Sequence, residues 1–277
     1  MTSTDWTSDT KGSGQYAEVN GLHLYFETHG TGRPLVLLHG GLGSGEMFGP
    51  VVAQLAASHQ VIVPDLQGHG RTADIDRPID LRLMADDIAA LIDHLGLDKP
   101  DLVGYSLGGG VAFHTAAKYP AKVGRVVVAS AYFRSDAAYP DIRDQQGQVN
   151  AASAEFMKAT PMYKLYEQVA PRPEDFPRLV GKIGKMMSHD FDYTEEVKSL
   201  QVPTMIVCAD ADMSPPSHAV EVFKLLDGGL RDGSWMAESR PKGGHALAIL
   251  SGLTHYNSFS SPLFAAVTLA FLDEQSG

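Results

Sequence analysis

The sequence predicts an α/β fold with a mostly parallel central sheet flanked by helices. Short, continuous apolar runs, as in residues 34–38 and 125–129, alternate with segments of helical spacing such as 81–95. Continuous apolar runs are typical of strands buried on both faces, and their alternation with helices indicates right-handed βαβ crossovers. The pentapeptide 104–108, Gly-Tyr-Ser-Leu-Gly, stands between one such strand and helix and indicates a sharp turn.

The first half of the chain adds its elements in a regular order. Residues 1–15 are rich in Ser, Thr, Asp and Gly, without a basic region or an apolar core, so we expect a mobile tail there. Residues 16–27 predict a β-hairpin, because alternating segments flank the turn dipeptide Asn20-Gly21. The elements that follow are a strand at 34–38, a helix over 47–57, a strand at 61–63, an amphipathic helix over 81–95, a strand at 101–103 and a helix over 109–118.

The alternation stops between residues 132 and 199. Five prolines divide this stretch into short helical pieces that carry Met and Tyr, and we interpret it as an inserted helical cap above the carboxyl edge of the sheet. The core is then predicted to consist of residues 16–131 and 200–277. Its later elements are a strand at 204–208, a helix over 218–226, a strand at 246–250 and a helix over 261–272.

Composition excludes several classes of partner. The chain has 277 residues and a formal net charge of −11, which disfavours nucleic acid and anionic membrane surfaces. No apolar run approaches the roughly 18 residues that a membrane span needs. The single cysteine, Cys208, lies in an apolar run, so we expect a buried strand residue in a cytoplasmic, soluble protein. A homodimer stays an open alternative.

No motif for a metal or a cofactor is evident, and none is expected. The chain lacks H-E-x-x-H, paired cysteines and a carboxylate cluster at ligand spacing. The glycine-rich loop 39–45 lacks the spacing of either nucleotide-binding glycine motif.

The pentapeptide predicts a nucleophile. In a G-x-S-x-G turn between strand and helix, the serine takes a strained conformation, and glycine is needed two residues to either side because side chains would collide. Ser106 would then present its Oγ at the carboxyl end of the strand and the amino end of the helix, where backbone N–H groups favour a developing oxyanion.

Several short motifs in order resemble the α/β-hydrolase family over residues 17–275. The family's oxyanion loop is similar to His39-Gly40-Gly41, its next turn is similar to residues 65–71 (DLQGHGR), and its nucleophile elbow is similar to residues 104–108. The resemblance implies the chain order serine, acid, histidine. It also implies an oxyanion hole made by the backbone N–H groups of Gly41 and Leu107.

Two aspartates compete for the acid. The family pattern favours Asp212, which stands shortly before Pro215-Pro216, over Asp210 at the end of the strand. Asp210 is then expected to hydrogen-bond the loop backbone. An acid after the strand that ends near Ser130 is a weaker alternative, because the nearest aspartate is Asp136.

The histidine must reach the serine from the carboxyl edge of the sheet. His255 follows the last expected strand, whereas His245 precedes it, so His255 is the predicted general base. His39 and His69 are expected to fasten backbone within the family's turns. The long stretch 228–244 between acid and histidine precedes the last strand and is expected to project away from the site.

These groups predict a serine hydrolase, in which imidazole activates the hydroxyl and a buried carboxylate orients the imidazole. Serine at position 106 disfavours epoxide hydrolases and haloalkane dehalogenases, whose resemblance would demand aspartate there. The expected substrate is a neutral, moderately hydrophobic small ester or lactone, since no Arg or Lys cluster is evident to bind an anionic group. Alternatives are a cofactor-free perhydrolase (haloperoxidase-like), a C–C bond hydrolase, an amidase or a hydrolase-like small-molecule receptor. Candidate substrate contacts are Leu42, Tyr105, Phe133, Met157, Met162 and Tyr163.

Overall fold

The computed structural model describes residues 13–229 and 244–273, whose strands form one eight-stranded sheet in the order β1-β2-β4-β3-β5-β6-β7-β8. Strands β1 and β2 pair with each other and with β4 in antiparallel fashion, and the pairs from β4 onward are parallel. This confirms the predicted, mostly parallel α/β sheet. The strands are β1 Ser13–Val19, β2 Leu22–His29, β3 Arg33–Leu38, β4 His59–Pro64, β5 Asp101–Tyr105, β6 Val126–Ala129, β7 Thr204–Ala211 and β8 Ala246–Thr254.

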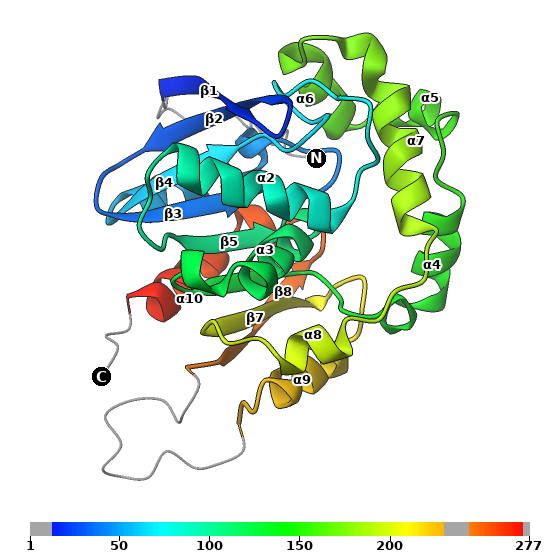
Figure 1. Cartoon of the computed structure of the whole chain (residues 1–277). Coiled ribbons are helices and arrows are strands. Elements are labelled where there is room, and N and C mark those ends of the chain that lie inside the picture. Colours follow the sequence, from blue (N-terminus) through cyan, green and yellow to red (C-terminus); the bar gives the residue numbers. More distant parts are fainter. Residues whose placement is uncertain (1–12, 230–243, 274–277) are drawn as a thin grey trace, which may run out of the picture.

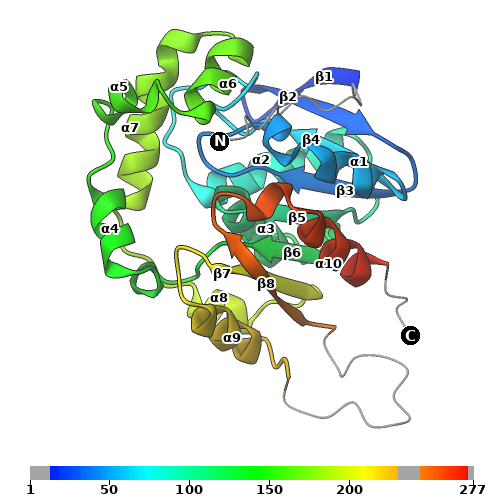
Figure 2. The same cartoon turned by 180° about the vertical axis from the view of Figure 1, so that it is seen from behind.

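Helices cover both faces of the sheet (Figures 1 and 2). Helices α2, α3, α8 and α9 lie on one face, and α1 and α10 lie on the other. The helices next to the core sheet are α1 Pro50–Ala56, α2 Leu81–His94, α3 Leu107–Lys118, α8 Thr194–Lys198, α9 Pro216–Leu225 and α10 Pro262–Leu272.

The hydrophobic core is divided by the sheet into two clusters. Along β3, Val36 and Leu38 pack on the α2 and α3 side, whereas Leu35 and Leu37 pack on the α1 and α10 side. All four side chains are fully buried. Because successive residues of a strand point to opposite faces, a strand covered on both sides must be apolar throughout. The continuous apolar runs of the sequence therefore correspond to the central strands.

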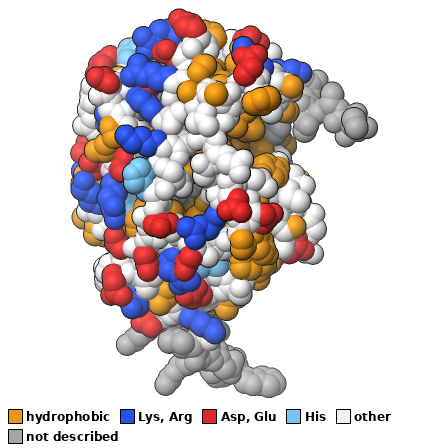
Figure 3. Space-filling view, turned by 90° about the vertical axis from the view of Figure 1, so that its right-hand side faces the viewer, with side chains coloured by type: hydrophobic (Ala, Val, Ile, Leu, Met, Phe, Trp, Pro, Cys, Tyr) orange, Lys and Arg blue, Asp and Glu red, His pale blue; other side chains and the backbone are white. Residues whose placement is uncertain are grey.

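The segment 132–199, between β6 and β7, contains short helices that stand together beside the sheet (Figure 1). Figure 3 shows this face of the molecule, with Lys and Arg side chains along one edge and hydrophobic side chains along the other. We call residues 132–199 the helical segment. Before α8, its helices are α4 Pro140–Gly147, α5 Ser153–Met157, α6 Pro161–Val169 and α7 Phe176–Met187. Short 3₁₀ turns complete the described chain at η1 Gly45–Phe48, η2 Pro120–Lys122, η3 Ser135–Ala137, η4 Pro173–Asp175 and η5 Ser258–Ser260.

Two boundaries differ from the expectations. Strand β1 begins at Ser13 and pairs with β2 from there, so the last three residues of the expected tail belong to the sheet. Residues 1–12 of that tail and most of the stretch 228–244 lie outside the described residues. Strand β8 runs to Thr254 because Ala211 pairs with Thr254 beyond an irregularity in β7. Within the described ranges, no helix is both long and apolar enough to cross a membrane.

Candidate active site

The turn at Ser106 joins β5 to α3 with a strained backbone. Ser106 has φ 53° and ψ −117°, a region that residues with a side chain rarely occupy. A Cβ atom at Gly104 would lie 2.0 Å from the carbonyl oxygen of Gly108, and one at Gly108 would lie 2.3 Å from that of Leu38. Both contacts are too short for any side chain. The two glycines are therefore required by sterics, as the pentapeptide predicted.

The structure brings Ser106, His255 and Asp212 together in one hydrogen-bonded chain. Ser106 Oγ lies 3.2 Å from Nε2 of His255, and Nδ1 of His255 lies 2.7 Å from Oδ1 of Asp212. Ser106 follows β5, Asp212 follows β7 and His255 follows β8, so three strand ends at the carboxyl edge of the sheet supply the three groups. Ser106 is partly exposed, whereas His255 and the carboxylate of Asp212 are buried.

The Asp212 carboxylate accepts a full set of hydrogen bonds. In addition to His255, it accepts the N–H of Met213 at 2.8 Å, the N–H of Ala209 at 3.1 Å and the hydroxyl of Ser130 at 2.7 Å. Burial alone would raise the pKa of Asp212, but the bonds from His255, Ser130 and the Ala209 N–H hold it below its usual value. Asp212 is therefore an anion at neutral pH, with both oxygens fixed.

Asp210 has a different environment although it lies only two residues away. It is exposed, and its carboxylate accepts the N–H groups of Gly252 and Leu253 in β8, at 2.8 and 3.2 Å. The irregular pairing between Ala209 and Ala211 turns Asp210 toward β8 and leaves Asp212 facing His255. The structure thus assigns the two aspartates different contacts.

Ser130 is a site residue that the sequence analysis did not identify. It follows β6, has φ 52° and is buried. Its hydroxyl donates to Asp212, and its N–H donates to the carbonyl of Val207 at 2.8 Å. The sequence marked this strand end only as an alternative position for the acid. A polar residue at the end of a strand next to β7 was the signal that could have revealed it.

The loop after β3 lies against the turn at Ser106. A Cβ atom at Gly40 would be 3.4 Å from Cβ of Ser106, and one at Gly41 would be 3.9 Å from Cβ of Leu107. Leu107 is the first residue of α3, so its N–H has no partner within the helix. The two predicted oxyanion donors, Gly41 and Leu107, therefore belong to adjacent backbone segments beside the nucleophile.

Buried histidines fasten this loop. Nδ1 of His39 lies 2.8 Å from the carbonyl oxygen of Gly40, and Nε2 accepts the N–H of Leu66 at 3.0 Å. The N–H of Gly40 also contacts the sulfur of Met47 at 3.3 Å. Burial lowers the pKa of His39 to about 4 and that of His69 to about 3, so both rings are neutral near pH 7.

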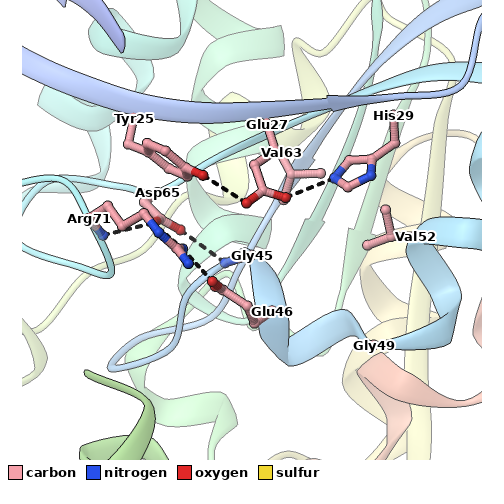
Figure 4. Close-up of a pocket in the computed structure, with 10 residues that line it drawn as sticks. All are labelled: Tyr25, Glu27, His29, Gly45, Glu46, Gly49, Val52, Val63, Asp65 and Arg71. Atoms are coloured by element: carbon pink, nitrogen blue, oxygen red, sulfur yellow. Dashed lines mark hydrogen bonds and ion pairs between the residues drawn. The ribbon is translucent and has the colours of Figure 1, made fainter. Parts of the chain in front are cut away.

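A polar cluster around Asp65 supports the same loop from the other side (Figure 4). Asp65 accepts the N–H of Gly45 at 3.0 Å and that of Arg71 at 2.8 Å, while the Arg71 guanidinium pairs with Glu46. Nearby, Tyr25 and His29 both point toward Glu27. Burial and the neighbouring Glu46 raise the pKa of Asp65 to about 7, against the backbone hydrogen bonds that lower it. The cluster therefore connects the loops that follow β3 and β4.

Two of the predicted substrate contacts, Tyr105 and Phe133, are buried in the hydrophobic core. Tyr105 is buried on the α1 and α10 side of the sheet, where its ring packs 5.0 Å from Phe259 and its hydroxyl donates to the carbonyl of His255. Because side chains alternate along β5, Tyr105 points to the opposite face of the sheet from its neighbour in the strand. Phe133 is buried edge-on against Phe113 at 4.9 Å and belongs to the core.

The other predicted contacts have mixed surroundings. Leu42 follows Gly41, is 9% exposed and has φ 60°. Met157 is half-buried against the core, and Met162 is 38% exposed. Tyr163 packs 5.0 Å from Phe176 and lines a cavity of about 390 Å³ within the helical segment. None of the residues that line this cavity is Ser106, Asp212 or His255.

His245, the rejected candidate for the base, lies before β8 and accepts the N–H of Thr204 at 3.3 Å. Thr204 begins β7, so His245 stands at the amino ends of these strands. It is therefore at the edge of the sheet opposite to Ser106.

Comparisons with known proteins agree with this geometry. A family model described as the alpha/beta hydrolase fold matches residues 33–161. The "Putative carbamate hydrolase RutD" of Azorhizobium caulinodans is 28% identical over 235 residues, which cover 78% of this chain and 86% of that protein. A soluble epoxide hydrolase of a Corynebacterium species is 43% identical over 103 residues, or 36% of this chain and 35% of that protein.

Among solved structures, a thermophilic esterase from Thermogutta terrifontis superposes with a TM-score of 0.71 at 23% identity, covering 95% of this chain and 98% of that one. At this identity the likeness shows the fold. Together with the family match, it establishes that the chain belongs to the α/β-hydrolase fold family. It is a hydrolase of that family.

Proposed function

We propose that this hydrolase cleaves a small, neutral, moderately hydrophobic carboxylic ester or lactone through a Ser106–His255–Asp212 triad. The observation that carries the proposal is the hydrogen-bonded chain from Ser106 Oγ through both ring nitrogens of His255 to Asp212. A serine hydroxyl is a weak nucleophile unless a base takes its proton, and this arrangement supplies that base.

The proposed reaction has two halves. Ser106 Oγ attacks the carbonyl carbon while His255 Nε2 takes the hydroxyl proton, and Asp212 stabilises the resulting imidazolium. The alcohol leaves with that proton, so an acyl-enzyme remains. Water then attacks the acyl carbon, gives its proton to His255 and releases the acid, and the proton returns to Ser106.

The N–H groups of Gly41 and Leu107 are the proposed donors to the tetrahedral oxyanion. Their segments contact each other beside Ser106. Removing one such donor typically costs about 10²–10³ in kcat. The neutral ring of His39 and the bond from Gly40 to Met47 keep this loop in place.

The proposal extends to the surroundings of the triad. We propose that the helical segment forms a cap that closes the substrate pocket. The proposed substrate contacts are Leu42, Met157, Met162 and Tyr163. Cys208 is buried and forms no disulfide among the described residues, which fits the cytoplasmic location that we propose.

A carbamate is a second candidate substrate, because the relative that matches 86% of its own length carries that name. Its carbonyl would be attacked by the same serine. An epoxide is disfavoured despite the shorter match, since the elbow holds serine where that chemistry would need aspartate. A perhydrolase, a C–C bond hydrolase and a small-molecule receptor remain alternatives.

The test is an activity panel of aryl esters of increasing acyl length, lactones and an aryl carbamate, with Ser106→Ala as the control. We expect ester or lactone turnover that the Ser106→Ala protein lacks while its circular dichroism spectrum is unchanged. Retention of more than a few per cent of the wild-type kcat would remove Ser106 from the mechanism. A single stoichiometric modification without turnover would favour a receptor.

A further inference from the structure

Helix α7 of the helical segment is fastened to the loop after β4 through one buried carboxylate. Asp74 in that loop is 2% exposed at its side chain, and its Oδ2 accepts Nε of Arg178 at 2.8 Å and Nζ of Lys182 at 2.6 Å. Its Oδ1 accepts the amide of Gln67 at 2.8 Å. Figures 1 and 2 both show the loop that follows β4 running alongside α7.

Lys182 uses all three of its donors at this junction. Besides Asp74, its ammonium donates to the carbonyl oxygens of Ile75 at 2.8 Å and Arg77 at 2.6 Å. Arg77 in turn pairs with Asp87 of α2, so the loop itself is tied to the core. Charged hydrogen bonds of this kind are stronger than neutral ones and fix geometry. We call Asp74, Arg178 and Lys182 the clasp.

The residue after Lys182 lies beside Gly41, one of the two proposed oxyanion donors. Ile183 is 4% exposed, and its Cδ1 lies 3.8 Å from the point that a Cβ atom of Gly41 would occupy. The same point is 3.9 Å from Cβ of Leu107. An isoleucine side chain is branched and stiff at χ1, so it forms a rigid wall beside the Gly41 backbone.

We propose that Ile183 is a specificity-determining residue that limits the bulk of the substituents on the reacting carbonyl, and that the clasp fixes its position. The inference rests on the proposed function, because the oxyanion donors define where the carbonyl lies. It narrows the substrate class to acyl compounds that are unbranched next to the carbonyl.

The experiment compares hydrolysis of p-nitrophenyl acetate with that of p-nitrophenyl trimethylacetate, which carries three additional methyl groups on the carbon next to the carbonyl. Wild type should strongly prefer the acetate. In Ile183→Ala, kcat/KM for the branched ester relative to the acetate should rise by about 10-fold or more, since a few methyl groups of space carry that discrimination. Lys182→Met, which keeps the aliphatic stem but loses the donors, should shift the ratio in the same direction by a smaller factor.

The control is Lys185→Met, which replaces an exposed lysine on the same helix and should leave the ratio unchanged. Urea unfolding of each variant shows whether the protein remains folded. If Lys182→Met does not fold, Lys182→Gln takes its place. An unchanged ratio in folded Ile183→Ala, with acetate turnover that depends on Ser106, would overturn the inference alone. Absence of Ser106-dependent turnover of either ester in wild type would overturn the proposed function and this inference together.

Discussion

The carboxyl edge of the sheet and the helical segment hold their side chains by different means. At the edge, Ser106, Asp212 and His255 each directly follow a strand, and Asp212 also accepts the backbone N–H groups of Ala209 and Met213. In the helical segment, Lys182 and Arg178 are held by a loop about a hundred residues earlier in the chain. Position at the edge is therefore a local property of strand ends, whereas position in the segment depends on long-range packing.

This difference predicts where substitutions act. Changes at the edge should alter the rate of the reaction with every substrate, because these groups touch the reacting atoms. Changes in the segment should alter the choice between substrates. The predictions below test that division, beginning with the largest effect.

The histidines at opposite ends of β8 should differ most. His255→Ala should lower kcat by about 10⁶-fold, as expected when a triad histidine is lost, and should remove the rise of kcat/KM with pH that follows from the need for a neutral imidazole. His245→Ala should retain both, since His245 accepts the N–H of Thr204 at the far edge of the sheet. Steady-state kinetics across pH measure this. An inactive His245→Ala enzyme together with an active His255→Ala enzyme would contradict the assignment of His255 as the general base.

The two aspartates should separate rate from stability. Asp212→Asn should reduce kcat by about 10⁴-fold, because the amide no longer sets the tautomer of His255. Asp210→Asn should mainly lower the unfolding temperature, since its carboxylate accepts two N–H groups of β8. Kinetics and thermal unfolding of both variants decide between them. A large loss of kcat in Asp210→Asn, with only a loss of stability in Asp212→Asn, would assign the acid role to Asp210.

The buried histidines of the edge should make stability depend on pH. Burial lowers the pKa of His39 to about 4, whereas an unfolded histidine titrates near 6.5. The unfolded chain therefore binds a proton that the folded one refuses, so His39 costs stability as pH falls from about 6.5 toward 4, by about 3 kcal/mol in total. Asp65 acts in the opposite sense, because its pKa is raised to about 7 in the folded protein. The folded carboxyl takes up a proton at a higher pH than the unfolded one, so Asp65 adds stability as pH falls.

A matched variant isolates the histidine from Asp65. His39→Asn should be less stable than wild type near pH 7, but its free energy of unfolding should fall less on going to pH 4.5. Urea unfolding at both pH values provides the comparison. Equal falls in the two proteins would show that His39 does not resist protonation in the folded state.

Ser130 tests whether a second layer of the edge also acts on rate. Ser130→Ala should lower kcat by roughly 10-fold, since a hydrogen bond to a charged group contributes about 1.5–3 kcal/mol. Ser130→Gly should lose the same bond but relieve the strain of φ 52°. The glycine variant should thus be as slow as the alanine variant and unfold at a higher temperature. Wild-type kcat in both would show that Ser130 does not act through Asp212.

The structure brings together the edge residues that the sequence singled out, for a physical reason. An elbow needs glycine at fixed spacing, so Ser106 followed from local pattern. The parallel strands bring their carboxyl ends to one line, which made His255 the expected base, and the resembled family's pattern favoured Asp212. The burial of Tyr105 and Phe133 could not be predicted, because an aromatic side chain beside a site can pack into the core on either face of the sheet. Asp74 and Lys182 could not be paired from sequence, since nothing local connects α7 to the loop after β4.

The smallest effects should come from the outer part of the helical segment. Met162→Ala or Tyr163→Ala should change kcat/KM for long acyl chains by a few-fold and leave the short ester nearly unaffected, because remote contacts add binding without touching the reacting carbonyl. Tyr163 already packs on Phe176 beside the cavity in the segment, and Met162 is partly exposed. A series of p-nitrophenyl esters from acetate to decanoate measures the change in chain-length preference. Equal losses for short and long esters would mean that these side chains only support the fold of the segment. The wall beside the carbonyl would then be limited to Ile183, whose Cδ1 lies 3.8 Å from the point that a Cβ atom of Gly41 would occupy.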